Sequence, residues 1–329
     1  MDAALENISR AEDMSGNIKL FISMIKLSSL LKEIKSPLLQ ECVVAGVRLS
    51  DGVILAKNRD RGYDARMEIV HEVLDNVEIV YWRDVDTDWS EGMNEFGIAI
   101  VNSSLMVNDD EKEADKVEKK REEKTDNKEK GKNPKHATDG AKIRQVLTQK
   151  NIRDAIKVLI STRGDGSSEF KGVSGQSLVS DGKDIYVVEH SSVDAPIIRK
   201  LKKDRKVVVR TNHGIYHKHL GYQSGPKLKS SESRMNLAKD HLQDAERDQD
   251  VLDLMKKKYK DNPFLNPYRT DNKFDMQTVG QIMMNCDTKT VTIRMDDRHG
   301  ELETVENLLP KGYEPKIKIK IEGKGRKVN

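Results

Sequence analysis

Cys42 and Asp60 are the residues whose types and spacing are most suggestive of chemistry in this chain. Cys42 opens an apolar stretch that reads as a strand, a tight turn at Ser50-Asp51-Gly52 and a second strand, and Asp60 follows in a polar loop. A hairpin brings its first residue close to the residues after its second strand, so we expect the thiol and the carboxylate to be neighbours. This arrangement indicates a nucleophilic cysteine.

A nucleophilic thiol needs a source of activation, because a free thiol titrates at about pH 8.5. The sequence leaves two sources open. One is a histidine, of which His213 in a Thr-Asn-His-Gly turn is the most suggestive. The other is the α-amine that Cys42 gains if the Glu41–Cys42 bond is cut, since an α-amine titrates at about pH 8 and can accept the thiol proton.

A series of short motifs follows Cys42 in a fixed order. They are Asn58-x-Asp60, GMNEFGIAIVN (92–102), VVVRTNHG (207–214) and SSESR (230–234). The series resembles the choloylglycine hydrolase, penicillin V acylase and acyl-coenzyme A:isopenicillin N acyltransferase superfamily of N-terminal nucleophile (Ntn) hydrolases, and its Thr-Asn-His turn is closest to the acyltransferase-like branch. The resemblance spans about Cys42 to Met295, apart from a charged insertion.

The resemblance implies both a fold and a maturation step. The fold is α+β, a four-layer αββα sandwich of two antiparallel sheets between helices. Residues 1–41 are then a leader or propeptide, and residues 42–329 are the Ntn hydrolase domain. Autocleavage at Glu41–Cys42 releases the leader, and the mature enzyme cleaves a linear amide, or transfers its acyl group, through a Cys42 acyl-enzyme.

The resemblance also implies roles for single residues. The expected catalytic side chains are Cys42, Asp60, Asn102, Asn212 and Arg234. Asp60 holds the α-amine through a charge-assisted hydrogen bond. Asn212 donates its amide to the oxyanion, helped by Asn102 or a nearby backbone N–H. Arg234 lies near the thiol and orders the carboxylate.

Lys57 is a departure from the superfamily pattern. Bile-salt hydrolases carry an arginine where this chain has Lys57. A lysine supplies a charge but not a forked pair of donors, so the two residues are not interchangeable.

The remaining segments must position these side chains. Strands are predicted at 77–82, 97–101, 206–210, 277–285 and 290–295, a hairpin at 175–188 with its turn at Asp181-Gly182, and helices at 141–159 and 231–255. This order of strands, helices, strands, helix and strands favours a layered α+β domain over alternating βαβ units.

Two segments are rich in charge. Residues 108–136 carry ten acidic and ten basic side chains, so we expect a flexible surface insertion there. Residues 316–329 alternate Lys and Ile and then become basic, and we expect this basic tail to fray.

The composition limits the functional classes. The net charge of +3 over 329 residues does not favour nucleic acid binding. No apolar stretch is long enough to cross a membrane, so we expect no stable membrane insertion and a cytoplasmic location. No Cys/His cluster suggests a metal, and we expect no cofactor.

The expected partner is a small-molecule acyl-amide substrate, and a homo-oligomer is compatible with the sequence. The second cysteine, Cys286, is expected in the core.

Two other functions remain open from the residues alone. In the first, the chain is a non-catalytic structural or binding protein on the same scaffold, with the charged insertion and the basic tail as contact elements. Alternatively, it is a Cys-His hydrolase that uses His213 and keeps its leader.

Overall fold

The computed structural model describes residues 40–61, 65–105, 139–161, 175–190, 195–270, 276–296 and 300–322, all within the unit Gln40–Asn329. Most of the expected leader (1–39), the charged insertion at 108–136 and the end of the basic tail (323–329) lie outside the described residues.

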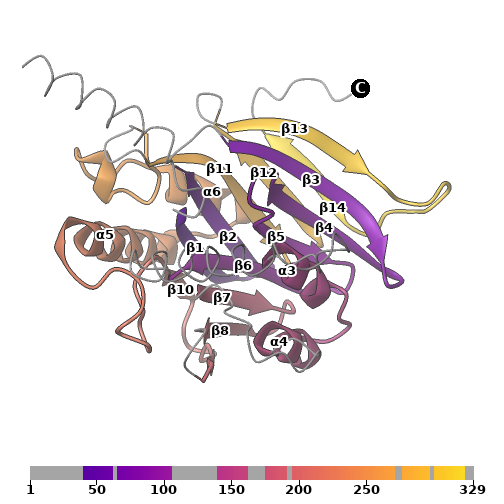
Figure 1. Ribbon diagram of the computed structural model, residues 1–329, viewed down its shortest axis with the longest axis horizontal. Helices are drawn as coiled ribbons and strands as arrows, with labels where there is room; N and C mark the ends of the chain where they lie inside the picture. The colour runs from indigo at the N-terminus through magenta and orange to yellow at the C-terminus, as the bar shows by residue number, and fades with distance from the viewer. Residues whose placement is uncertain are drawn as a thin grey trace, which may run out of the picture. The chain divides into compact units, whose positions relative to one another are not determined.

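Sheet A has six strands in the order β10-β1-β2-β11-β12-β14 (Figure 1). Its strands are β1 (Gln40–Leu49), β2 (Gly52–Arg61), β10 (Val207–Arg210), β11 (Gln277–Asn285), β12 (Thr290–Met295) and β14 (Lys318–Glu322). The β1–β2 hairpin turns at Gly52, whose φ of 133° lies in a region that favours glycine.

Sheet B has eight strands in the order β13-β3-β4-β5-β6-β7-β8-β9. Its strands are β3 (Ala65–Leu74), β4 (Val77–Asp84), β5 (Ser90–Asn94), β6 (Ala99–Ser104), β7 (Gly175–Ser180), β8 (Ile185–His190), β9 (Ile197–Lys200) and β13 (Gly300–Asn307). Antiparallel pairing dominates both sheets, and each has one parallel edge pair, β12–β14 in sheet A and β13–β3 in sheet B.

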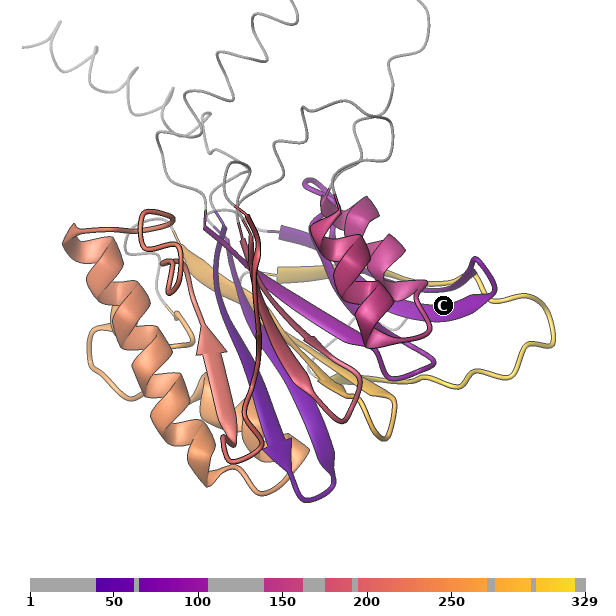
Figure 2. The same cartoon turned by 90° about the horizontal axis from the view of Figure 1, so that it is seen from below.

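Two pairs of helices cover the outer faces of the sheets, and Figure 2 shows them on opposite sides of the strands. The helices are α3 (Asp139–Leu147), α4 (Ile152–Ile160), α5 (Gly225–His241) and α6 (Asp248–Lys256), with short 3-10 turns η1 (Leu242–Asp244) and η2 (Pro263–Leu265). The predicted helix at 141–159 is interrupted because Asn151 caps α4 by accepting from Asp154 N.

Three hydrophobic clusters separate four layers. One cluster lies between the sheets and includes Leu55 and Trp82. A second packs Ile54 of sheet A against Leu252 of α6, and a third packs Ile79 of sheet B against helices α3 and α4. Ile54 and Leu55 are neighbours on β2 that point to opposite faces, so the sheet is buried on both sides. The predicted αββα sandwich is therefore confirmed.

The structure differs from the sequence-based expectation at two strands. β1 begins at Gln40, so Cys42 lies inside the strand and does not open it. The basic tail was expected to fray, but Lys318–Glu322 form β14 and pair with β12. The Lys-Ile alternation explains this, because a period of two turns Ile319 toward the inter-sheet cluster.

Candidate functional site

The β1–β2 hairpin sets the frame of the site. Glu41 is the register partner of Asp60, and Cys42 is the partner of Arg59. Directly paired residues share a face of the sheet, and successive residues alternate. Glu41 and Asp60 therefore lie on one face, whereas Cys42 and Arg59 lie on the other. The predicted proximity of Cys42 and Asp60 is real, but their side chains diverge.

Arg234 of α5 connects four of the predicted site residues. Its Nη1 donates to the backbone oxygen of Cys42 at 3.2 Å and to Asp60 Oδ2 at 3.4 Å. Its Nη2 donates to Glu41 Oε2 at 2.8 Å and to Asn212 Oδ1 at 3.1 Å. The Arg234 side chain is fully buried. One guanidinium thus fixes both residues of the Glu41–Cys42 bond to helix α5.

The Glu41 carboxylate lies among three donors. Besides Arg234, Arg269 Nη2 donates to Oε2 at 2.6 Å and the Tyr222 hydroxyl donates to Oε1 at 2.7 Å. Burial alone would raise the pKa of Glu41, but Arg269, Arg234 and Tyr222 together hold that pKa below its usual value. Glu41 is only 2% exposed, so this is a buried anion in a cationic pocket.

Asp60 shares the same cations from the neighbouring strand. Its Oδ1 accepts from Thr278 Oγ1 at 2.7 Å, and Arg269 Nε lies 3.7 Å from its Oδ2. Burial raises the pKa of Asp60 more than Arg269 and Arg234 lower it. Asp60 is the carboxylate expected to hold the α-amine of Cys42. It thus lies beside Glu41, the residue that precedes Cys42.

Asn212 presents its oxygen to Cys42. Asn212 Oδ1 accepts from the backbone N of Cys42 at 3.0 Å. Its Nδ2 donates to Ser104 O at 3.0 Å and to Ser103 Oγ at 3.3 Å. Because Cys42 N and Arg234 are both donors, the oxygen must face them. In the continuous chain the Asn212 amide contacts the serines, and its expected role toward an oxyanion stays a prediction.

A second charged group occupies the Cys42 face of the hairpin. Lys57 Nζ donates to Glu91 Oε2 at 2.9 Å and to Asn102 Oδ1 at 3.1 Å. Arg59 Nε donates to Glu91 Oε1 at 3.0 Å. Burial lowers the pKa of Lys57, while the charges of Cys42 and Glu91 oppose this shift. Asn102 therefore joins the site through Lys57, on the opposite side from Arg234.

Glu91, Tyr222 and Arg269 are site residues that the sequence reasoning missed. Glu91 immediately precedes the GMNEFGIAIVN motif, and Tyr222 and Arg269 lie in no motif. The position of Glu91 next to this motif was the only signal for it, because its strand, Ser90–Asn94, is short and largely polar. No comparable signal marks Arg269.

The two other singled-out residues lie in different surroundings. His213 Nδ1 is 2.8 Å from Ser231 Oγ and 3.2 Å from Thr211 Oγ1, and burial lowers the His213 pKa. Among the described residues no hydrogen bond joins it to Cys42. Cys286 packs in the inter-sheet cluster, where burial raises its pKa to about 12. The expectation that Cys286 is a core residue is confirmed.

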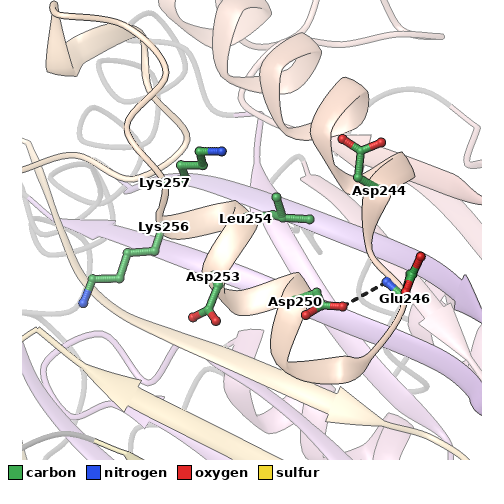
Figure 3. A pocket seen from close by; sticks show the side chains of 7 residues that line it. All are labelled: Asp244, Glu246, Asp250, Asp253, Leu254, Lys256 and Lys257. Atoms are coloured by element: carbon green, nitrogen blue, oxygen red, sulfur yellow. Dashed lines mark hydrogen bonds between the residues drawn. The ribbon is translucent and has the colours of Figure 1, made fainter.

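A separate surface hollow lies around helix α6 (Figure 3). It is lined by Asp244, Glu246, Asp250, Asp253, Leu254, Lys256 and Lys257. No predicted site residue is among them, and the side chains labelled in Figure 3 are acidic, basic or apolar, with no cysteine. The hollow is therefore distinct from the site at Cys42.

Two features are absent from the described part of the chain. No group of His, Cys, Asp and Glu side chains in the described ranges is arranged to bind a metal ion. None of the described helices has the length and apolar character required to cross a membrane.

Comparisons with known proteins give one family. The family model described as acyl-coenzyme A:6-aminopenicillanic acid acyl-transferase matches residues 50–299, which include Asp60, Asn102, Asn212 and Arg234 and begin after Cys42. Among solved structures, penicillin V acylase from Agrobacterium tumefaciens is similar, with 14% identity over 78% of this chain and 86% of that chain and a TM-score of 0.44. No curated protein matches.

Proposed function

The chain belongs to the acyl-coenzyme A:6-aminopenicillanic acid acyl-transferase family, and from this premise we propose that it is a self-processing cysteine Ntn enzyme. Its nucleophile is Cys42 and its autocleavage site is the Glu41–Cys42 bond. The mature enzyme hydrolyses a linear amide, or transfers its acyl group, through a thioester on Cys42 Sγ.

The contacts of Arg234 carry this proposal. Its guanidinium binds the Glu41 carboxylate, the Cys42 carbonyl oxygen, Asp60 and Asn212. A buried arginine with four acidic or carbonyl partners around one peptide bond is more than packing requires, because each buried charge costs free energy unless it is compensated. The arrangement supports a site built around Glu41–Cys42.

These positions support a route for self-cleavage. Cys42 Sγ attacks the Glu41 carbonyl carbon, the C–N bond breaks, and the departing nitrogen takes the thiol proton to become the α-amine of Cys42. Asn212 Oδ1 already accepts from this nitrogen at 3.0 Å and stays as its acceptor, with Asp60 close by. Water then hydrolyses the thioester and releases a leader that ends at Glu41.

Turnover repeats the same steps on a substrate. The free α-amine takes the proton of Cys42 Sγ and passes it to the leaving amine as the substrate acyl group forms a thioester. The buried Lys57 lies on the same face of the hairpin as Cys42, and in this mechanism its charge stabilises negative charge at the sulfur. Lys57 thereby supplies the positive neighbour expected from the arginine of bile-salt hydrolases.

The test is intact-mass analysis of the purified chain. We expect a product that starts at Cys42, a Cys42→Ala variant that remains full length, and a Cys286→Ala variant that is processed like the wild type. A full-length wild-type chain whose Cys42 is not labelled by an electrophilic acyl probe contradicts the proposal. A full-length chain that is active and loses activity in His213→Ala instead supports the Cys-His alternative.

A further inference from the structure

The pocket that holds the Glu41 side chain bears on which acyl group a substrate can carry. Arg234, Arg269 and Tyr222 donate to the Glu41 carboxylate at 2.8, 2.6 and 2.7 Å. Both arginines are at most 1% exposed. Arg234 Nε and Arg269 Nη1 are buried N–H groups without a hydrogen-bond partner among the described residues, so the pocket has donors beyond those that Glu41 uses.

Self-cleavage changes the charge of this pocket. In the continuous chain two buried guanidinium groups face two carboxylates, Glu41 and Asp60. Release of residues 1–41 removes one carboxylate and creates the α-amine of Cys42. Asp60 is then the remaining acid beside two arginines and an amine. A buried cation without a counter-charge is unfavourable, so the mature pocket favours a new anion.

The chemistry of self-cleavage defines where that anion belongs. The intermediate is a thioester of Cys42 Sγ with an acyl group whose side chain ends in a carboxylate, joined to the acyl carbon through Cα, Cβ and Cγ of Glu41. Turnover forms the same kind of thioester on the same sulfur. A substrate acyl group of equal length can therefore place its own carboxylate on Arg234, Arg269 and Tyr222.

We propose that the mature enzyme selects amides whose acyl group carries a carboxylate at the reach of a glutamate side chain, that is, glutaryl or α-glutamyl amides. This inference rests on the proposed function. The reaction balances: the amide C–N bond breaks, the thiol proton leaves with the amine, and water converts the thioester to a dicarboxylate and regenerates the thiol. Lys57 and Glu91, on the opposite face of the hairpin, do not take part in this recognition.

The first experiment compares acyl groups on one leaving group. We would measure kcat/KM for the 4-nitroanilides of glutaric, succinic, adipic and pentanoic acids with the processed enzyme. Charge-assisted hydrogen bonds predict a preference for glutaryl over the uncharged pentanoyl group of roughly 10- to 100-fold. The shorter succinyl and longer adipoyl groups are expected to fall between them. Equal rates for glutaryl and pentanoyl anilides overturn the inference.

Variants link the preference to the pocket. Tyr222→Phe removes one donor to the carboxylate and is expected to lower the glutaryl-to-pentanoyl ratio several-fold. Arg269→Gln removes a charge and should lower it further. Tyr259→Phe is the matched control, because the Tyr259 hydroxyl donates to Leu254 O, and the ratio should not change. An unchanged ratio in Tyr222→Phe and Arg269→Gln contradicts the assignment.

A binding measurement on the wild-type enzyme tests the inference even if the variants fold poorly. Free glutarate should protect Cys42 of the processed wild-type enzyme from alkylation, and pentanoate at the same concentration should not. Protection by neither acid overturns the inference. Failure of the proposed function looks different, because the chain then keeps residues 1–41 and hydrolyses none of the anilides.

Discussion

Glu41 is central to the site at the scale of single residues, although the sequence marks it only as the residue before the nucleophile. Two buried arginines and a tyrosine hydroxyl hold its carboxylate, and they keep its pKa below the usual 4.5 despite burial. A carboxylate whose pKa is lowered by folding stabilises the folded chain while it is ionised. The Glu41 side chain, which would leave with residues 1–41 under the proposed function, is therefore one of the groups that stabilise the uncleaved chain.

This linkage predicts a pH dependence that can be measured in an uncleaved Cys42→Ala background. Glu41→Gln is expected to lower the free energy of unfolding by about 3–5 kcal/mol near neutral pH, because it leaves buried cations uncompensated. The folded-state pKa is depressed, so the contribution of Glu41 is fully present above its usual pKa of 4.5 and is lost as the pH falls through the folded-state pKa.

Urea denaturation from about pH 7 down to about pH 3 checks the prediction. The difference between Cys42→Ala and Cys42→Ala/Glu41→Gln should be largest at the upper end and should shrink as the pH falls below about 4.5. A difference that does not vary with pH would show that the charge of Glu41 is not what stabilises the chain.

The site residues that the sequence predicted are those that stand in recognisable short motifs. Asp60, Asn212 and Arg234 stand in short motifs, and the structure brings them to Cys42 or Glu41 as expected. Arg269 contacts Glu41 across 228 positions and has no motif. Its place depends on how the segment after η2 packs against β1, and local patterns do not encode such packing.

At the scale of elements, a buried ion-pair network joins strand β2 of sheet A to strands β5 and β6 of sheet B. Lys57 and Arg59 of β2 both bind Glu91 of β5, and Lys57 also binds Asn102 of β6. The side chains of Lys57, Arg59 and Glu91 are fully buried. Arg59 and Lys57 lower the pKa of Glu91 against the effect of burial. The network fixes the two sheets to each other directly behind Cys42.

Loss of the Glu91 carboxylate, which Lys57 and Arg59 share, should lower the free energy of unfolding. Glu91→Gln in the Cys42→Ala background leaves two buried cations without their carboxylate, and we expect a loss of about 3–5 kcal/mol in the free energy of unfolding. Urea denaturation measures it. The matched control is Asp154→Asn, which removes an exposed ion pair to Lys157 and should have no measurable effect. Equal effects of the two variants contradict the role of the network.

The C-terminal strand was predictable from its period but not from its charge. Lysines alternate with isoleucines around β14, and the charge led us to expect fraying, whereas the alternation is the pattern of a strand with one buried face. Ile317, just before β14, is 2% exposed and belongs to the inter-sheet cluster, while Ile321 is 38% exposed. Packing against the second sheet decides whether this segment frays or forms a strand.

A pair of identical substitutions tests this packing. Ile317→Ala should lower the free energy of unfolding by about 2–5 kcal/mol, because it leaves a cavity in the core. Ile321→Ala, at an exposed position of the adjacent strand, should change it by less than about 0.5 kcal/mol. Urea denaturation of both variants in the Cys42→Ala background gives the comparison. If both substitutions are neutral, β14 does not contribute to the core in solution.

At the scale of the whole molecule, the fold encloses the proposed nucleophile. Cys42 is 1% exposed on the face of sheet A that carries Lys57 and Arg59, and Asp60, Asn212 and Arg234 are buried as well. Residues 40 and 41 continue β1 past the thiol and pair with the end of β2. A substrate therefore cannot reach Cys42 while this extension is in place. Under the proposed function, cleavage at Glu41–Cys42 would both create the base and open the site, so processing and activation would be a single event.

This coupling predicts that thiol reactivity appears together with cleavage. In a Cys286→Ala background, only Cys42 can react with Ellman's reagent under native conditions. We expect almost no rapid reaction in the full-length chain, and about one reactive thiol per chain in the processed form, with the two time courses coinciding. Arg234→Lys keeps the charge but loses the forked contacts to Glu41 and Cys42, so it should slow both processes equally. Reactivity that precedes loss of residues 1–41, or stays absent after it, contradicts the proposal that Glu41–Cys42 cleavage uncovers Cys42.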